Sequence, residues 1–224
     1  MTLVLVGMSV SDVDRRQELL AAAGRLDASV AFLQMGDPSL SRELTRLADT
    51  GVHTVTLVGV SLGALAPAHS WLRRIAGHWW RERSGDRPVI EVATRLVTAV
   101  DGIAAALEER RPISGGEPGL TSAAWEDVTG HRRQVLLCRG PRCTARGSDE
   151  TARALVLGLM EAGLGDHDVL LTHTGCQFPC NQAPVVSVQP DDVWYGAVDP
   201  DTARRIVVEH LVADRPVADR RLPR

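Results

Sequence analysis

The four cysteines constrain this chain more than any other feature, because all of them fall between positions 138 and 180 and the preceding 137 residues contain none. They form two pairs, Cys138-x4-Cys143 and Cys176-x3-Cys180, and a helix is predicted in the interval between the pairs. Cysteines used only to fill a core would be scattered along the chain. We therefore expect a C-terminal fold that brings two cysteine-bearing loops to one place.

The spacing of the cysteines favours an iron–sulfur cluster. Structural zinc sites usually contain Cys-x2-Cys pairs, and redox disulfides use the same spacing, which neither pair has. Four thiolates from two loops match the ligand set of a [2Fe–2S] cluster. Gly140, Gly147 and Gly175 lie beside the cysteines, where backbone N–H groups can point towards cluster sulfur. Zinc or a redox-active disulfide remains the alternative.

Three arginines, Arg139, Arg142 and Arg146, surround the first cysteine pair. A cluster with four thiolates is negatively charged, so nearby cations would favour its reduction and could guide an acidic partner. Alternatively, they are ordinary solvated arginines, since every basic residue of this chain is arginine.

The composition is that of an ordinary globular protein, with 44% hydrophobic and 24% charged residues and a formal net charge of −3. This balance gives no indication of binding to nucleic acid or to an anionic membrane surface. The N-terminal MTLVLVGMSV lacks the basic region and the cleavage site of a signal peptide, and no apolar run is long enough to cross a bilayer. We expect a cytoplasmic protein.

The first half of the sequence alternates predicted strands with predicted helices. This order predicts an α/β fold with a four-stranded parallel sheet that is covered on both faces. Ser11 with Asp14 is typical of a capping box, and Asp37-Pro38 of a helix N-terminus. No Gly-x-Gly-x-x-Gly motif follows any strand. The strands are expected at 2–7, 29–33, 53–62 and 89–93, and the last helix at 98–109.

The chain is predicted to contain two domains. Residues 1–110 form the first, and residues 111–131, rich in Gly and Pro, form a linker. Residues 132–213 have the order β-α-β-β-β-α, which suits a small α/β domain of the thioredoxin kind. Residues 214–224 form an Arg- and Pro-rich tail that is expected to fray.

The stretch CRGPRCTARGSDE…TGCQFPCNQAPVVSVQPDDVWYGAVDPDTARRIVVEHL resembles the thioredoxin-like [2Fe–2S] ferredoxins. It shares their C-x4-C and C-x3-C pairs, the strand–turn–strand PVVSVQPDDVWYG and the closing helix. The resemblance covers roughly Arg132 to Val212. It implies a [2Fe–2S] cluster held by Cys138, Cys143, Cys176 and Cys180, and a redox partner protein.

Residues 2–110 resemble the small class II tetrapyrrole chelatases, which insert cobalt or iron into sirohydrochlorin. The resemblance rests on TLVLVGMS, VAFLQMGDPSLSRELTRLADTGVHTVTLVGVSL, PAHSWLRRI and VIEVATRLVTAVDGIAAALEER. It implies a cleft for a tetrapyrrole or for a cobalt or iron ion. Single-domain members dimerise to complete this cleft, so a homodimer, or a substitute partner, is expected.

The chelatase family uses two histidines, and only one has a counterpart here. His69 corresponds to the second, after a loop at Gly63–Ala68 that is longer than the family's. The turn that carries the first reads Gly7-Met8-Ser9, so Met8 takes its place. A thioether is a weak ligand and no base, which puts metal insertion in doubt. Met8 and His69 could hold a soft metal, or Met8 could simply fill space while His69 is a loop or capping residue.

Trp71, Ile75 and Trp79 fall on one stripe of a predicted helix. A flat macrocycle would stack on such a face. A stripe of this kind also packs on a sheet or a partner subunit, and that is the reading we favour.

Three functions are compatible with these patterns. The first is a [2Fe–2S] electron-transfer protein of tetrapyrrole metabolism, in the cobalamin or sirohaem branch, whose N-terminal half binds a macrocycle or a partner. The second is an active chelatase that uses His69 as its catalytic residue, with a regulatory cluster. The third is a non-catalytic redox sensor or binding protein in which both halves are degenerate. We favour the first, because the cluster's ligand set is complete and the chelatase's is not.

Overall fold

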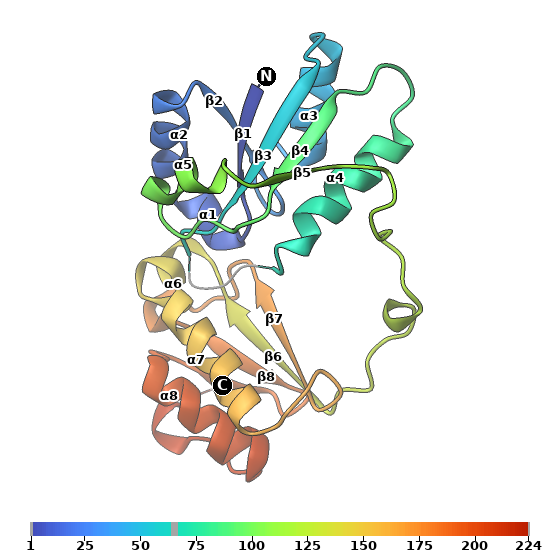
Figure 1. Cartoon of the computed structure of the whole chain (residues 1–224). Coiled ribbons are helices and arrows are strands. Elements are labelled where there is room, and N and C mark those ends of the chain that lie inside the picture. The colour runs from blue at the N-terminus through green and yellow to red at the C-terminus, as the bar shows by residue number, and fades with distance from the viewer. Residues whose placement is uncertain (1, 64–66, 224) are drawn as a thin grey trace. The chain divides into compact units, whose positions relative to one another are not determined.

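The computed structural model describes residues 2–63 and 67–223. The chain divides into two compact units, an N-terminal unit (Met1–Trp125) and a C-terminal unit (Glu126–Arg224). Each unit has its own sheet flanked by helices (Figure 1). Within the described ranges, no helix is long and apolar enough to cross a membrane.

The sheet of the N-terminal unit has five strands in the order β2-β1-β3-β4-β5. The first four are parallel, but β5 runs antiparallel to β4 and pairs Arg111 with Val92. The prediction of a four-stranded parallel sheet was therefore wrong: the sheet is mixed. Edge strands tolerate proline and charged residues, so the composition of β5 resembled that of a linker. The strands are β1 (Thr2–Gly7), β2 (Ala28–Phe32), β3 (Thr54–Val60), β4 (Val89–Ala93) and β5 (Arg110–Pro112).

Two hydrophobic cores lie on the two faces of this sheet, because alternate residues of a strand point to opposite faces. Val4 and Val6 pack in the core under α3 and α4, whereas Leu5 packs in the core under α2 and α5. The last predicted helix, 98–109, is reduced to a 3₁₀ turn, η1, and the short α5. The helices are α1 (Val10–Asp14), α2 (Arg16–Arg25), α3 (Leu40–Asp49), α4 (Ser70–Glu82), η1 (Val100–Gly102), α5 (Ile103–Ala106) and η2 (Ala123–Trp125).

A buried carboxylate joins the loop after β1 to the loop after β3. Asp12 is fully buried and accepts hydrogen bonds from the backbone N–H groups of Ser9, at 2.7 Å, and Leu62, at 2.7 Å. Ser9 and Asp12 form the capping box of α1, two residues earlier than the box predicted at Ser11 and Asp14. These hydrogen bonds of Asp12 fix both loops at the C-terminal edge of the sheet. Residues 64–66, within the loop that was expected to be long, lie outside the described residues.

The segment after β5 is folded onto α4. Glu117 accepts hydrogen bonds from the backbone N–H groups of Ser114, at 3.0 Å, and Gly115, at 2.9 Å, and pairs with Arg73 of α4 at 2.9 Å. Burial alone would raise the pKa of Glu117, but these donors lower it. The first part of the predicted linker thus belongs to the N-terminal unit.

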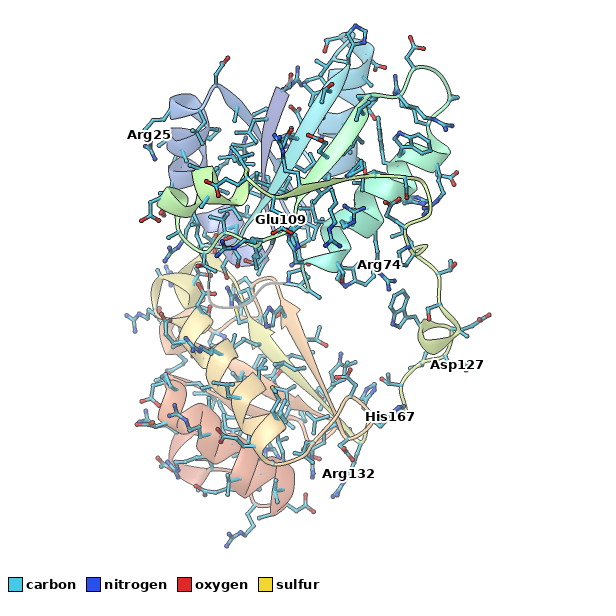
Figure 2. The ribbon with its side chains drawn as sticks, viewed as in Figure 1. Arg25, Arg74, Glu109, Asp127, Arg132 and His167 are labelled. Atoms are coloured by element: carbon cyan, nitrogen blue, oxygen red, sulfur yellow. The ribbon has the colours of Figure 1, made fainter. Side chains whose placement is uncertain are left out.

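The predicted stripe on α4 divides between two environments. Trp79 is buried in the core, as expected for a residue that packs on the sheet. Trp71 instead stacks on the ring of Trp125, with centroids 5.4 Å apart. The guanidinium of Arg74, labelled in Figure 2, lies 5.3 Å from each of the two ring centroids. This cation–π contact holds Trp125 against the helix.

The sheet of the C-terminal unit has four strands in the order β7-β6-β8-β9. β6 pairs in parallel with β7 and antiparallel with β8, which pairs antiparallel with β9. The helices α7 and α8 lie on one face of the sheet (Figure 1). The elements are β6 (Arg133–Cys138), α6 (Pro141–Ala145), α7 (Ser148–Glu161), β7 (Val169–Thr174), η3 (Cys180–Gln182), β8 (Val186–Gln189), β9 (Val193–Tyr195), α8 (Pro200–Arg205), η4 (Ile206–Val212) and η5 (Ala218–Arg220).

The segment that was expected to fray is packed against the sheet. Val217 is fully buried, and the backbone N–H of Leu222 donates to the carbonyl of Trp194 at 2.7 Å. Arg221 forms a β-bridge with Tyr195. The prediction of a frayed tail was wrong, because residues 214–223 add backbone pairing and an apolar contact at the edge formed by β9.

A polar chain runs through the core of the C-terminal unit. The ring of His210 is buried, with Nδ1 2.8 Å from Tyr195 Oη and Nε2 2.9 Å from Asp191 Oδ2. Burial lowers the pKa of His210 and raises that of Tyr195 to about 12. A neutral His210 can accept a hydrogen bond from the Tyr195 hydroxyl and donate one to Asp191, so that all three side chains have a hydrogen-bond partner. Asp191 in turn pairs with the buried Arg133 at 2.5 Å.

Candidate metal centre

The parallel pairing of β6 and β7 explains why the two cysteine pairs meet. Cys138 ends β6 and lies opposite Thr174, the last residue of β7. Cys176 follows β7 after a single glycine, and Cys180 begins η3. Since parallel strands end at the same edge of a sheet, both loops leave the sheet side by side. The sequence patterns predicted this convergence.

The first loop folds back through the short helix α6, which the sequence analysis missed. Gly140 is its N-terminal cap and Pro141 its first residue, a combination typical of a helix start. The helix returns Cys143 to the apolar layer in which Cys138 lies. Both thiols pack there with Ala183 and Val185.

The second loop is held by a glutamine that sequence reasoning did not single out. Gln177 donates from Nε2 to Thr174 Oγ1 at 2.7 Å and accepts at Oε1 from Ser187 Oγ at 3.1 Å. Ser187 is fully buried in β8. The glutamine therefore fixes the loop between Cys176 and Cys180 to two strands, and only its position between the cysteines could have indicated this role.

The thiols contact one another. Cys176 Sγ and Cys180 Sγ lie 3.3 Å apart, and Cys138 and Cys143 belong to one buried apolar cluster. Burial and the neighbouring Cys138 thiol raise the pKa of the Cys143 thiol to about 11. The backbone N–H of Phe178, together with the Cys180 thiol, lowers the pKa of Cys176. Cys176 therefore ionises more readily than Cys143, and a metal bound by all four thiols must displace protons from the others.

The site has a dry half and a wet half. Cys138 and Cys143 are each 2% exposed, whereas Cys176 is exposed and Cys180 half-buried. A metal centre held here would be shielded by protein on one side. On the other it would be open to an exchange partner.

The arrangement of donors suits a cluster. Within residues 2–63 and 67–223, no group of three or more His, Cys, Asp or Glu side chains is placed to hold a single metal ion. A [2Fe–2S] cluster is held by four cysteine thiolates, two on each of its two irons. The four converging thiols, half of them in a dry layer, fit that group.

Gly140 provides room for the second loop. A Cβ added to Gly140 would lie 3.0 Å from Cys176 Cβ and 3.1 Å from Cys176 Cα. A Cβ on Gly175, by contrast, would meet nothing within 4 Å. Of these two glycines beside the cysteines, only Gly140 is required by close packing.

The three arginines at the first cysteine pair have different surroundings. The side chain of Arg139 is 5% exposed and pairs with Asp149. Arg142 and Arg146 are exposed, and Arg142 donates to Asn181 Oδ1 at 3.3 Å. Arg139 therefore has a structural partner, and Arg142 and Arg146 supply the positive charge at the surface of this site.

In the N-terminal unit, Met8 and His69 meet at Gly59. A Cβ on Gly59 would lie 3.2 Å from Met8 Sδ and 3.3 Å from His69 Nε2. Met8 is fully buried, and His69 Nε2 is buried with no hydrogen-bond partner in the described part of the chain. Burial, with a smaller contribution from Arg73, lowers the pKa of His69, so its ring is neutral. We call this pair the Met8–His69 site.

The C-terminal unit is a small α/β fold whose four-stranded sheet carries both cysteine pairs in loops at one edge. No family model matches the chain. A candidate 2Fe-2S ferredoxin of Priestia megaterium is 38% identical over 92 residues, or 41% of this chain and 70% of that protein. A 2Fe-2S ferredoxin of Aquifex aeolicus is 39% identical over 75 residues, or 34% of this chain and 68% of the relative.

A solved structure is also similar. The thioredoxin-like [2Fe-2S] ferredoxin of Aquifex aeolicus is 33% identical, with 41% of this chain and 97% of that chain covered and a TM-score of 0.38. The chain belongs to the 2Fe-2S ferredoxins. The longest match to these two relatives spans 92 residues, which is fewer than the C-terminal unit contains. That unit holds all four cysteines.

Proposed function

We propose that this protein is a one-electron carrier whose C-terminal unit holds a [2Fe–2S] cluster on Cys138, Cys143, Cys176 and Cys180. The convergence of these four thiols at the ends of β6 and β7 supports the proposal most directly. Bound there, the cluster would accept and release single electrons. The chain's own residues bury Cys138 and Cys143, leave Cys176 exposed and Cys180 half-buried, and fix the second loop through Gln177.

This proposal is tested by anaerobic purification of the full chain. We expect about two irons and two sulfides per chain, a visible absorption spectrum of the oxidised cluster, and a rhombic EPR signal after reduction with dithionite. Changing any one of the four cysteines to serine should lower the iron content. A colourless protein that contains zinc would overturn the proposal.

We further propose that the N-terminal unit links the carrier to tetrapyrrole metabolism, in the cobalamin or sirohaem branch, by binding a metallated macrocycle at the Met8–His69 site. The Nε2 of His69, which has no hydrogen-bond partner among residues 2–63 and 67–223, lies beside a thioether sulfur and can serve as a metal ligand. Imidazole nitrogen and thioether sulfur are both known ligands of tetrapyrrole metals, so His69 and Met8 would hold the metal of such a macrocycle. Gln34 donates to the Met8 carbonyl at 3.5 Å and lines an apolar hollow of about 300 Å³ with Leu33, Pro67, Trp71 and Ile75.

Titration with cobalt sirohydrochlorin tests the Met8–His69 site. We expect His69→Ala to weaken binding, read from the shift of the tetrapyrrole band, by at least about tenfold, because the nitrogen donor is lost. His78→Ala is the matched control, since His78 lies on α4, the helix that His69 precedes as its N-cap, and is also partly buried. Equal affinities for the wild type and for His69→Ala would contradict this role.

The alternative is a chelatase in which His69 removes pyrrole protons. A neutral histidine with a free nitrogen can act as that base. If Met8 is the only obstacle, Met8→His should create or raise cobalt insertion into sirohydrochlorin. Unchanged insertion would show that residue 8 does not limit the reaction.

A further inference from the structure

Phe178 lies on the loop between Cys176 and Cys180, and its side chain is 72% exposed. Its backbone has φ +53°, the left-handed conformation that bulky residues rarely adopt. A large apolar ring that is both exposed and held on strained backbone contributes little to the stability of the fold. Such strain typically persists where function requires it.

Two hollows flank this ring. Phe178 and Pro179 line both hollows and so form a ridge between them. One, of about 490 Å³, is lined in addition by Pro141, Arg142, Cys180 and Asn181. The other, of about 300 Å³, is lined in addition by Gln177, Trp194, Leu222 and Pro223.

Two exposed arginines lie near the second cysteine pair or on the loop of the first. Arg142 lies in the first hollow beside Cys180, and Arg146 is exposed on the same loop. Arg139, the third arginine of the loop, is paired with Asp149. An approaching carboxylate would therefore meet Arg142 next to the cysteines of the wet half.

We infer that Phe178, Arg142, Pro141 and Asn181, which we call the Phe178 surface, form the docking site for an acidic electron-transfer protein. The inference rests on the proposed electron-carrier function. Phe178 enters an apolar depression of the partner, as aromatic anchors do in protein interfaces, and Arg142 pairs with a carboxylate at its rim. No atom is transferred: one electron leaves this chain beside Cys180 and one enters the partner.

The test uses reduced full-length protein with its cluster and flavodoxin as an acidic probe, mixed by stopped flow. Phe178→Ala should lower the second-order rate constant at least tenfold. The reaction with ferricyanide, a small oxidant that needs no docking surface, should stay unchanged. Met160→Ala is the matched control, because Met160 is 70% exposed on α7 of the same unit and should react like the wild type. Arg142→Gln should weaken the dependence of the flavodoxin rate on ionic strength.

A second measurement does not depend on any variant. Hydrogen exchange of the wild type should show that flavodoxin protects the peptide that contains residues 175–182. Equal flavodoxin rates for Phe178→Ala and the wild type, or no protection of that peptide, would overturn the inference. So would a change from dimer to monomer in Phe178→Ala, since the surface would then bind a second copy of this chain. Failure of the electron-carrier function itself would appear differently, as a wild type without the spectrum of a [2Fe–2S] cluster.

Discussion

Replacing Gly140 with alanine is expected to remove most of the cluster from the protein. The added Cβ would lie 3.0 Å from Cys176 Cβ and 3.1 Å from its Cα. These atoms belong to backbone and to the first side-chain carbon, so they cannot move aside without shifting the loop. Overpacking of this kind costs about 1–3 kcal/mol, and here the cost falls directly on the position of a proposed iron ligand.

Gly175→Ala is the matched control, because Gly175 precedes the same cysteine and its added Cβ would meet nothing within 4 Å. After anaerobic purification, Gly140→Ala should contain less than about half of the wild-type iron and sulfide and show a correspondingly weaker visible absorption. An overpacking cost of the size given above would produce such a loss. They should stay at the wild-type level in Gly175→Ala. A full complement of iron in Gly140→Ala would show that the Cys176 loop relaxes freely and that the packing at Gly140 does not position the ligand.

Replacing Arg133 with methionine should destabilise the C-terminal unit by about 2 kcal/mol, because the hydrogen bonds of a buried guanidinium to two charged groups are lost. Arg133 is 6% exposed and bonds to Asp191 at 2.5 Å and to Asp214. Burial alone would raise the pKa of Asp191, but its bonds with Arg133 and His210 lower it. Without Arg133 the carboxylate loses its principal counter-charge beside the buried His210.

The neighbouring arginine provides a matched control. Arg132, labelled in Figure 2, is 69% exposed and lies 3.5 Å from the same Asp214. Exposed pairs of this kind contribute at most about 1 kcal/mol, so Arg132→Met should have little effect. Hydrogen exchange of the amides in β6 and β8 measures the opening of the C-terminal unit independently of the N-terminal unit. Similar losses of protection in the two variants would contradict a special role for the buried arginine.

The C-terminal unit was largely predictable from the sequence. The family that the cysteine spacing indicated is confirmed by its relatives, and the two loops converge because β6 and β7 are parallel. That these four cysteines are the ligands stays a prediction. What the sequence did not reveal depends on contacts between distant residues, such as Gln177 with Ser187 or Gly140 with Cys176.

The N-terminal unit was less predictable. Alternating strands and helices indicated its four parallel strands, but β5 has the charged, proline-containing composition of a linker and is recognisable only from its pairing with β4. Met8 and His69 were suspected as partners, and the structure brings both to Gly59. The resemblance of this half to tetrapyrrole chelatases stays a prediction.

The return of the C-terminal segment to β9 matters for anyone who would transplant the electron-carrying unit into another protein. The sequence suggests a cut after residue 213, yet Val217 fills the core beside Tyr195 and Leu222 continues the pairing along Trp194. A module ending at residue 213 would leave that tyrosine and its histidine open to water. A transplantable module should retain the segment through residue 223, and fused sequences are better attached ahead of β6.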